Sequence, residues 1–147
     1  MLSADRVLKY KMGPVAVEFA QPVAAGCSVF RGSITAVCQD GTLVQAGAAA
    51  PPSPMVGILG IAQHQQINTA GAPGTDAFYG GGTVRCRKGT WALPFDVAPT
   101  WADFDKPVYA VDDETVSLTQ TPEGGTARLL VGTLCGLDAD GTPYVEI

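Results

Sequence analysis

The sequence predicts an all-β protein: a small β-barrel or β-sandwich-like domain with an extended N-terminal arm and long loops. Short segments in which apolar and polar residues alternate recur about every ten residues, which is typical of the strands of such folds. The chain also contains 18 glycines and 11 prolines without low-complexity repeats. This composition favours many short strands joined by turns over long helices.

The chain is long enough for one ordinary domain. It has 147 residues, of which 46% are hydrophobic and 16% are charged, so it has enough apolar material for a core and no signature of global disorder. We expect an arm over residues 1–13 and a single β domain over residues 14–147. The arm shows neither strand alternation nor a capped helix, so we expect contact with another molecule to order it.

The first half of the chain contains three alternating segments that predict strands, at residues 15–19, 27–30 and 34–38. Turns are expected at residues 21–26 and 31–33 between them. Asp40 and Gly41 follow the third segment and predict a hairpin turn, because glycine adopts the positive φ that such a turn needs. Residues 45–54 contain three prolines and predict an exposed loop.

The middle of the chain begins with an almost wholly apolar segment. Residues 55–62 predict a strand that is buried on both faces, and their two glycines favour a β-bulge. Residues 63–82 lack periodicity, so we expect an interaction loop or a mobile loop there. Alternation resumes at residues 83–87, whose two arginines share one face, and a further strand is expected within residues 90–95.

The last third predicts a β-hairpin followed by a return strand. Residues 104–111 and 115–119 alternate on either side of Asp112-Asp113-Glu114, and residues 129–135 form the return strand. Adjacent strand residues point to opposite faces, so we interpret the acidic cluster as the exposed tip of a turn and not as paired catalytic carboxylates. Residues 138–141 predict a hairpin turn, since a calcium loop aligned there would lack carboxylates at its first and last positions.

The composition argues against several classes of partner. The formal charge of −5 and the pI of about 4.6 make nucleic acid an improbable partner. No apolar run reaches the length of a membrane span, and the first dozen residues contain no signal-peptide core. The one histidine and the widely spaced cysteines predict no metal or other cofactor.

The four cysteines are expected to be free thiols of a protein made in a reducing cytosol. A disulfide between Cys27 and Cys38 is the alternative.

No catalytic set is evident. The serines stand outside any nucleophile-elbow motif, and His64 lies in a glutamine-rich segment without an orienting acid beside it. A triple glycine at residues 80–82 near basic residues could bind an anion, but it lacks the ending and the setting of a phosphate loop. We therefore expect no enzymatic activity. A hydrolase that relies on His64 is a third hypothesis, which we rank behind two that involve no catalysis. Trp91 and Trp101 are either core residues or anchors of a subunit contact.

Four segments, in their order and spacing, carry a family resemblance. They are Ala25-Gly26-Cys27-Ser28-Val29-Phe30, Val56-Gly57-Ile58-Leu59-Gly60-Ile61-Ala62, the hairpin from Phe104 to Leu118, and Leu130-Val131-Gly132-Thr133-Leu134. Over roughly residues 15–147 the chain resembles the small bacteriophage capsid cement, or decoration, proteins of the DUF2190 type. The segment from 63 to 103 departs from the family in being longer and more aromatic.

The resemblance implies a compact β domain without enzymatic activity, made in the bacterial cytoplasm and commonly trimeric. It also implies a place on the exterior of an icosahedral phage head, at local threefold positions, where it binds the major capsid protein. We expect the contact surfaces to include Arg6, Val7, Leu8, Tyr10, His64, Phe78, Tyr79, Trp91 and Trp101. The alternative is a carbohydrate- or ligand-binding β module on a virion or cell surface, which exposed Trp91 and Trp101 on one flat face would favour.

Overall fold

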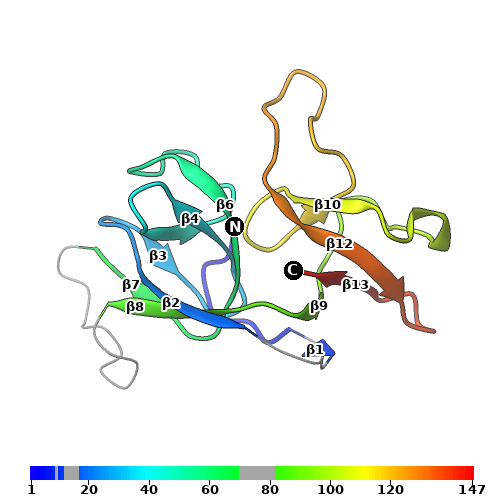
Figure 1. Cartoon of the computed structure of the whole chain (residues 1–147), viewed down its shortest axis with the longest axis horizontal. Coiled ribbons are helices and arrows are strands. Elements are labelled where there is room, and N and C mark those ends of the chain that lie inside the picture. Colours follow the sequence, from blue (N-terminus) through cyan, green and yellow to red (C-terminus); the bar gives the residue numbers. More distant parts are fainter. Residues whose placement is uncertain (9, 12–16, 70–81) are drawn as a thin grey trace.

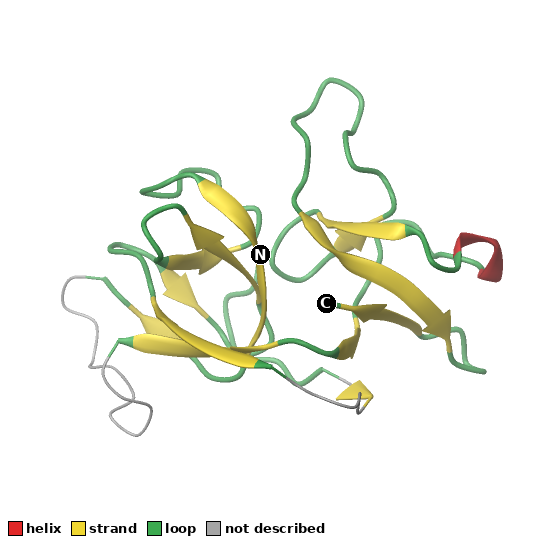
Figure 2. Ribbon diagram, viewed as in Figure 1, coloured by secondary structure: helices red, strands yellow, loops and turns green. Residues whose placement is uncertain are grey.

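The computed structural model describes residues 1–8, 10–11, 17–69 and 82–147. Within these ranges the protein is essentially all-β, with strands in three sheets and a single 3-10 turn, η2 (Trp101–Asp103) (Figure 2). The predicted fold class is confirmed, and the arrangement is that of a sandwich-like domain.

One half of the molecule is a five-stranded antiparallel sheet. Its order is β2 (Glu18–Pro22), β8 (Thr83–Arg87), β6 (Met55–Ala62), β4 (Ile34–Cys38) and β5 (Leu43–Gln45). A short ladder of β3 (Ser28–Val29) and β7 (Gln66–Ile67) lies beside it (Figure 1). The predicted turn between β4 and β5 is present, with Gly41 at a φ of 81°.

The other half is a six-stranded sheet. Its order is β1 (Tyr10–Lys11), β9 (Thr90–Ala92), β13 (Pro143–Glu146), β12 (Leu130–Leu137), β10 (Pro107–Ala110) and β11 (Val116–Ser117). The chain passes from the first sheet to this one between β8 and β9 (Figure 1). The predicted terminal hairpin and its return strand are therefore confirmed as β10, β11 and β12.

The main hydrophobic core joins the two sheets. Ile34 and Ile61 from the five-stranded sheet pack in one cluster with Trp91, Leu134 and Val145 from the six-stranded sheet, and all five are almost fully buried. Burying one such large side chain stabilises the fold by about 1.5–3 kcal/mol. Two smaller clusters lie within the first half, around Leu43 and around Val44.

β12 and β13 approach each other so closely that position 132 requires a glycine. A Cβ atom on Gly132 would lie 1.8 Å from the Glu146 carbonyl oxygen, which no side chain tolerates. The predicted irregularity of β6 is also present, because the β4–β6 register shifts twice along the ladder.

Several predicted boundaries were wrong. β2 continues through Gln21 and Pro22, where a turn was expected, because an edge strand tolerates proline. Gln45 belongs to β5 and is buried, although an exposed loop was predicted to begin there. Val56 is 60% exposed, so β6 is not buried on both faces. β7 forms inside a segment that shows no periodicity, because its partner β3 is distant in sequence.

All four cysteines are free, so the alternative disulfide between Cys27 and Cys38 does not form. Burial raises the pKa of the Cys86 thiol to about 11, which leaves it protonated at neutral pH.

Candidate interaction surface

The N-terminal segment lies against the chain's own body. The Leu2 N–H donates to both carboxylate oxygens of Asp113, at 3.0 and 3.2 Å. The Arg6 N–H donates to the Arg31 carbonyl oxygen, and the Arg6 guanidinium donates to the carbonyl oxygens of Gly32 and Glu114. The segment thereby ties the two halves of the molecule together. The expectation that another molecule orders this segment is wrong for residues 1–8.

Gly32 makes room for this contact. Its φ is 87°, and a Cβ atom there would lie 2.4 Å from the Arg6 Cγ atom and 2.7 Å from the Arg6 carbonyl oxygen. A side chain at position 32 would therefore push Arg6 away from the turn. Farther along, Tyr10 and Lys11 form β1 and pair with β9, so the backbone of this segment also joins the six-stranded sheet.

The acidic cluster at residues 112–114 is not simply an exposed tip. Asp113 is fully buried and accepts hydrogen bonds from the Ser33 hydroxyl at 2.9 Å and from the Gln45 side-chain amide at 2.5 Å, besides those from Leu2. Burial raises the pKa of Asp113, and its hydrogen-bond donors oppose that shift. The sequence-based interpretation is wrong for Asp113, because residues far away in sequence cover the turn. Its flanking acids, Asp112 and Glu114, stay partly exposed.

Two of the predicted contact residues are buried. His64 is 7% exposed; its Nε2 accepts a hydrogen bond from the Arg85 N–H at 3.1 Å, and its Nδ1 lies 3.3 Å from the Gln65 carbonyl oxygen. Trp91 is 6% exposed and belongs to the main core. Neither side chain can contribute an exposed contact in this conformation.

The other predicted contact residues are scattered. Val7 is 80% exposed, whereas Leu8 packs partly against the main core. Tyr10 is described only by its backbone in β1. Phe78 and Tyr79 lie outside the described residues. The structure therefore does not bring the predicted set together as one surface.

Trp101, the remaining predicted residue, forms an aromatic knob with Phe104. Their side chains are 63% and 54% exposed, and their ring centroids lie 6.2 Å apart with the planes 30° from parallel. Trp101 also lies over Gly136 of β12, where an added Cβ atom would be 3.4 Å from its Cη2 atom. Phe104 was not predicted as a contact residue, although its spacing from Trp101 matches a single helical turn.

A carboxylate holds the backbone of the knob in place. Asp103 accepts hydrogen bonds from the N–H and the hydroxyl of Thr100, at 2.8 and 2.9 Å, and from the Lys106 ammonium at 2.8 Å. The Lys106 hydrogen bond and those from Thr100 lower the pKa of Asp103 to about 2. The two aromatic rings are therefore presented on a pre-formed turn.

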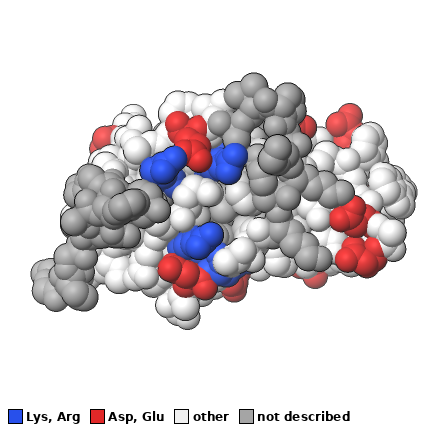
Figure 3. Space-filling model, turned by 90° about the horizontal axis from the view of Figure 1, so that it is seen from below, with Lys and Arg blue, Asp and Glu red and all other residues white. Residues whose placement is uncertain are grey.

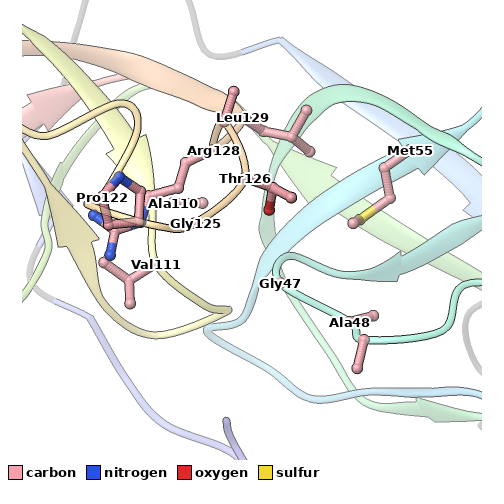
Figure 4. A pocket seen from close by; sticks show the side chains of 12 residues that line it. Gly47, Ala48, Met55, Ala110, Val111, Pro122, Gly125, Thr126, Arg128 and Leu129 are labelled. Carbon is pink, nitrogen blue, oxygen red and sulfur yellow. The ribbon is translucent and has the colours of Figure 1, made fainter.

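A cleft lies between the two sheets (Figure 4). It has a volume of about 430 Å³ and is lined mainly by small and apolar side chains, including Ala48, Met55, Val111 and Leu129. Its one charged lining residue is Arg128, which donates to the Thr119 carbonyl oxygen and lies 3.7 Å from the Asp96 carboxylate. The volume of this cleft lies in the range of small-molecule sites.

A second exposed apolar patch lies at the start of the edge strand β2 and includes Val17, which precedes the strand. Val17 and Phe19 are 42% and 44% exposed, and among the described residues β2 pairs with a neighbour on one side only. Glu18 pairs with Arg85 and Arg87 of the adjacent strand. On the face that Figure 3 shows, basic side chains of the described residues lie beside acidic ones. That arrangement does not offer the continuous basic track that a phosphate backbone requires.

Among the described residues, no group of three or more His, Cys, Asp or Glu side chains could hold a metal ion. No helix in the same part of the chain is long and apolar enough to cross a membrane. Comparisons of the chain with protein-family models, with curated proteins and with solved structures gave no match. Function is therefore inferred from the chemistry of the surface and from the resemblance in sequence.

Proposed function

We propose that the protein is a structural component of a phage virion: a capsid cement, or decoration, protein on the outside of an icosahedral head. In this role it binds at local threefold positions and stabilises contacts between major capsid subunits. One observation carries the proposal: the domain exposes two separate apolar patches, the aromatic knob and the Val17–Phe19 patch on β2. The 3-10 turn that carries the knob, red in Figure 2, lies well apart from strand β2, which Figure 1 labels in the same view. Exposed apolar patches mark interaction surfaces, and two of them allow one copy to join two neighbours.

The mechanism is thermodynamic linkage. A protein that binds the assembled shell and not the free subunits shifts the equilibrium toward the shell. Each copy needs only a modest interface, because many copies act on one lattice and a copy with two contacts gains avidity. This role requires no chemical step, so the protein needs no enzymatic activity to perform it. The burial of His64 and the hydrogen bond at its Nε2 also remove the support for a hydrolase that relies on it.

The test measures binding of the purified protein to shells assembled from the major capsid protein of the same phage. Wild-type protein should co-sediment with shells, leave free subunits unbound and raise the temperature at which the shells melt. Phe19→Ser should weaken shell binding about 30-fold, because truncating a hot-spot residue costs about 2 kcal/mol. Val97→Ser is the matched control, because Val97 is 75% exposed and belongs to neither patch. Equal binding to shells and to free subunits would refute the mechanism.

The position of the N-terminal segment changes how its role is tested. Deleting residues 1–12 would remove the hydrogen bonds to Asp113 as well as any capsid contact. Val7→Ser is a cleaner probe, because the Val7 side chain is exposed while its neighbour Arg6 keeps the anchor. We expect weaker shell binding with an unchanged melting temperature of the free protein. Unchanged binding would remove the segment from the contact surface.

A carbohydrate- or ligand-binding module is the second candidate. The stacked pair of Trp101 and Phe104 favours it, since exposed aromatic rings bind sugar faces. The burial of Trp91 weakens it, because the two tryptophans do not share a flat face. The test is whether glycans from a panel quench the fluorescence of Trp101. Quenching in the wild type that is lost in Trp101→Phe would favour this candidate over the capsid role.

A further inference from the structure

Strand β2 directs part of its main chain away from the sheet. At the start of its antiparallel ladder with β8, the Lys88 N–H donates to the Val17 carbonyl oxygen at 2.9 Å. Hydrogen-bonded and non-hydrogen-bonded positions alternate along such a ladder, so the odd-numbered residues of β2 direct their N–H and C=O groups at β8. The N–H and C=O groups of Glu18 and Ala20 therefore point to the other side, which we call the free edge of β2.

The free edge is unpaired within the ranges that the structure describes. Glu18 and Ala20 are exposed, and no described group pairs with their N–H and C=O groups. The opposite edge of the same sheet is different, because a parallel bridge between Val23 and Leu43 occupies the outer side of β5. With 5 residues, β2 is also the longest of the described edge strands. Proteins usually shorten or cover such an edge, so an open one indicates a site for strand pairing.

The two faces beside the free edge differ in polarity. Residues directly opposite one another in an antiparallel pair lie on the same face of the sheet. Phe19 stands opposite the fully buried Cys86, so it lies on the core face, yet its side chain is 44% exposed at the margin of the sheet. Glu18 lies on the other face, where it stands opposite Arg87 and also pairs with Arg85. A strand added here would meet an apolar side chain on one face and charged side chains on the other.

We propose that an extended segment of the major capsid protein adds to the free edge of β2 as a further strand. This inference rests on the proposed function and deepens it, because it states how the patch at β2 binds the capsid. A row of N–H and C=O groups at strand spacing is satisfied by another strand, which is the recognition mode called β-augmentation. The segment alternates along its length, with apolar side chains beside Phe19 and polar ones beside Glu18.

A capsid segment fits this edge better than β2 of a second copy does. β2 and β8 together carry two arginines against one glutamate. Pairing two copies would bring these identical groups together, whereas a different strand need not carry the same charges. Pro22 has no N–H, so each strand of a self-paired edge would also lack one donor.

Ala20→Pro tests the free edge. Proline removes the N–H and places its ring where the added strand would lie. The fold should tolerate the change, because the N–H of residue 20 points away from β8 and Pro22 already occupies the equivalent position two residues later. Ala20→Ser is the matched control, since it alters the side chain and keeps the N–H. Ala20→Pro should bind shells at least about tenfold more weakly than the wild type, whereas Ala20→Ser should bind as the wild type does.

Amide hydrogen exchange of the wild type gives a second readout, which decides alone if Ala20→Pro does not fold. In the free protein the N–H groups of Glu18 and Ala20 should exchange fast, and those of Phe19 and Gln21 slowly, because only the latter two bond to β8. On shells all four should exchange slowly. Fast exchange of Glu18 and Ala20 on shells, or slow exchange in the free protein, would contradict the added strand.

The outcomes separate this inference from the capsid role. Shell binding that Ala20→Pro leaves intact, or that Ala20→Ser weakens equally, would overturn the added strand while the capsid role stands. An oligomer of the free protein that Ala20→Pro dissolves would assign the edge to a second copy and overturn the inference as well. A wild type that does not bind shells would refute the capsid role and the inference together.

Discussion

Replacing Asp113 with alanine should destabilise the protein far more than its place in an acidic turn suggests. The carboxylate is fully buried and accepts hydrogen bonds from Leu2, Ser33 and Gln45. A hydrogen bond to a charged group contributes about 1.5–3 kcal/mol, and an unsatisfied buried donor costs about 1–3 kcal/mol. Relief of the buried charge and hydration of the Leu2 N–H offset part of the loss. We expect a net loss of about 3 kcal/mol.

Chemical and thermal unfolding measure this loss. For a domain of this size, about 3 kcal/mol lowers the melting temperature by roughly 6–12 °C. Glu114→Ala is the matched control, since its side chain is 37% exposed and an exposed ion pair contributes about 0–1 kcal/mol. The loss in Asp113→Ala should also expose the peptide bond after Arg6 to trypsin. A loss below about 1 kcal/mol, or an equal loss in Glu114→Ala, would refute the assigned role of the buried carboxylate.

The pH dependence gives an independent check on Asp113. Its pKa is raised in the folded state from an ordinary value of 3.8, so the folded protein holds this proton more tightly than the unfolded chain does. Its contribution to stability is therefore fully present below the ordinary pKa and declines as the pH rises through the raised pKa. Asp113→Asn should remove that decline. Parallel stability curves for wild type and variant above pH 3.8 would contradict the raised pKa.

Three further predictions follow from local geometry. Gly132→Ala should cost at least about 3 kcal/mol or prevent folding, because its Cβ would meet the Glu146 carbonyl oxygen, whereas Gly57→Ala meets nothing within 4 Å and should change the urea midpoint little. Asp103→Asn should destabilise the protein at neutral pH, because the lowered pKa of Asp103 adds stability above its ordinary value of 3.8. The difference from wild type should shrink as the pH falls from 3.8 through about 2, and a difference of unchanged size at pH 2 would contradict the assigned pKa. The Cys86 thiol, with a pKa of about 11, should react with a disulfide reagent at pH 8 only after unfolding, and rapid reaction in the folded protein would show that its burial is overstated.

Strand positions were predictable because the signals that define them are local. β4, β6 and β8 begin and end at the expected residues, since side-chain alternation, turn glycines and prolines act over a few neighbours. The β7 strand was missed because its two residues are too few to show an alternation of apolar and polar side chains. Only their pairing with β3, which is distant in sequence, makes them a strand.

The candidate contact surface was less predictable. Trp101 was expected as a subunit anchor and is exposed, but Trp91 has the same chemistry and lies in the core. A tryptophan is buried or exposed according to the sheets that pack on it, and this packing depends on residues distant in sequence. His64 shows the same limit, because the Arg85 N–H that donates to its ring comes from strand β8, distant in sequence.

Composition and periodicity determined that this protein is built from short strands and where most of them lie, because backbone preference and side-chain alternation are properties of neighbouring residues. Tertiary structure alone decided that Asp113 is buried beneath the N-terminal segment and that β2 is an edge strand of its sheet. Burial and relative position depend on contacts between remote segments. Alternation along the chain carries no record of those contacts.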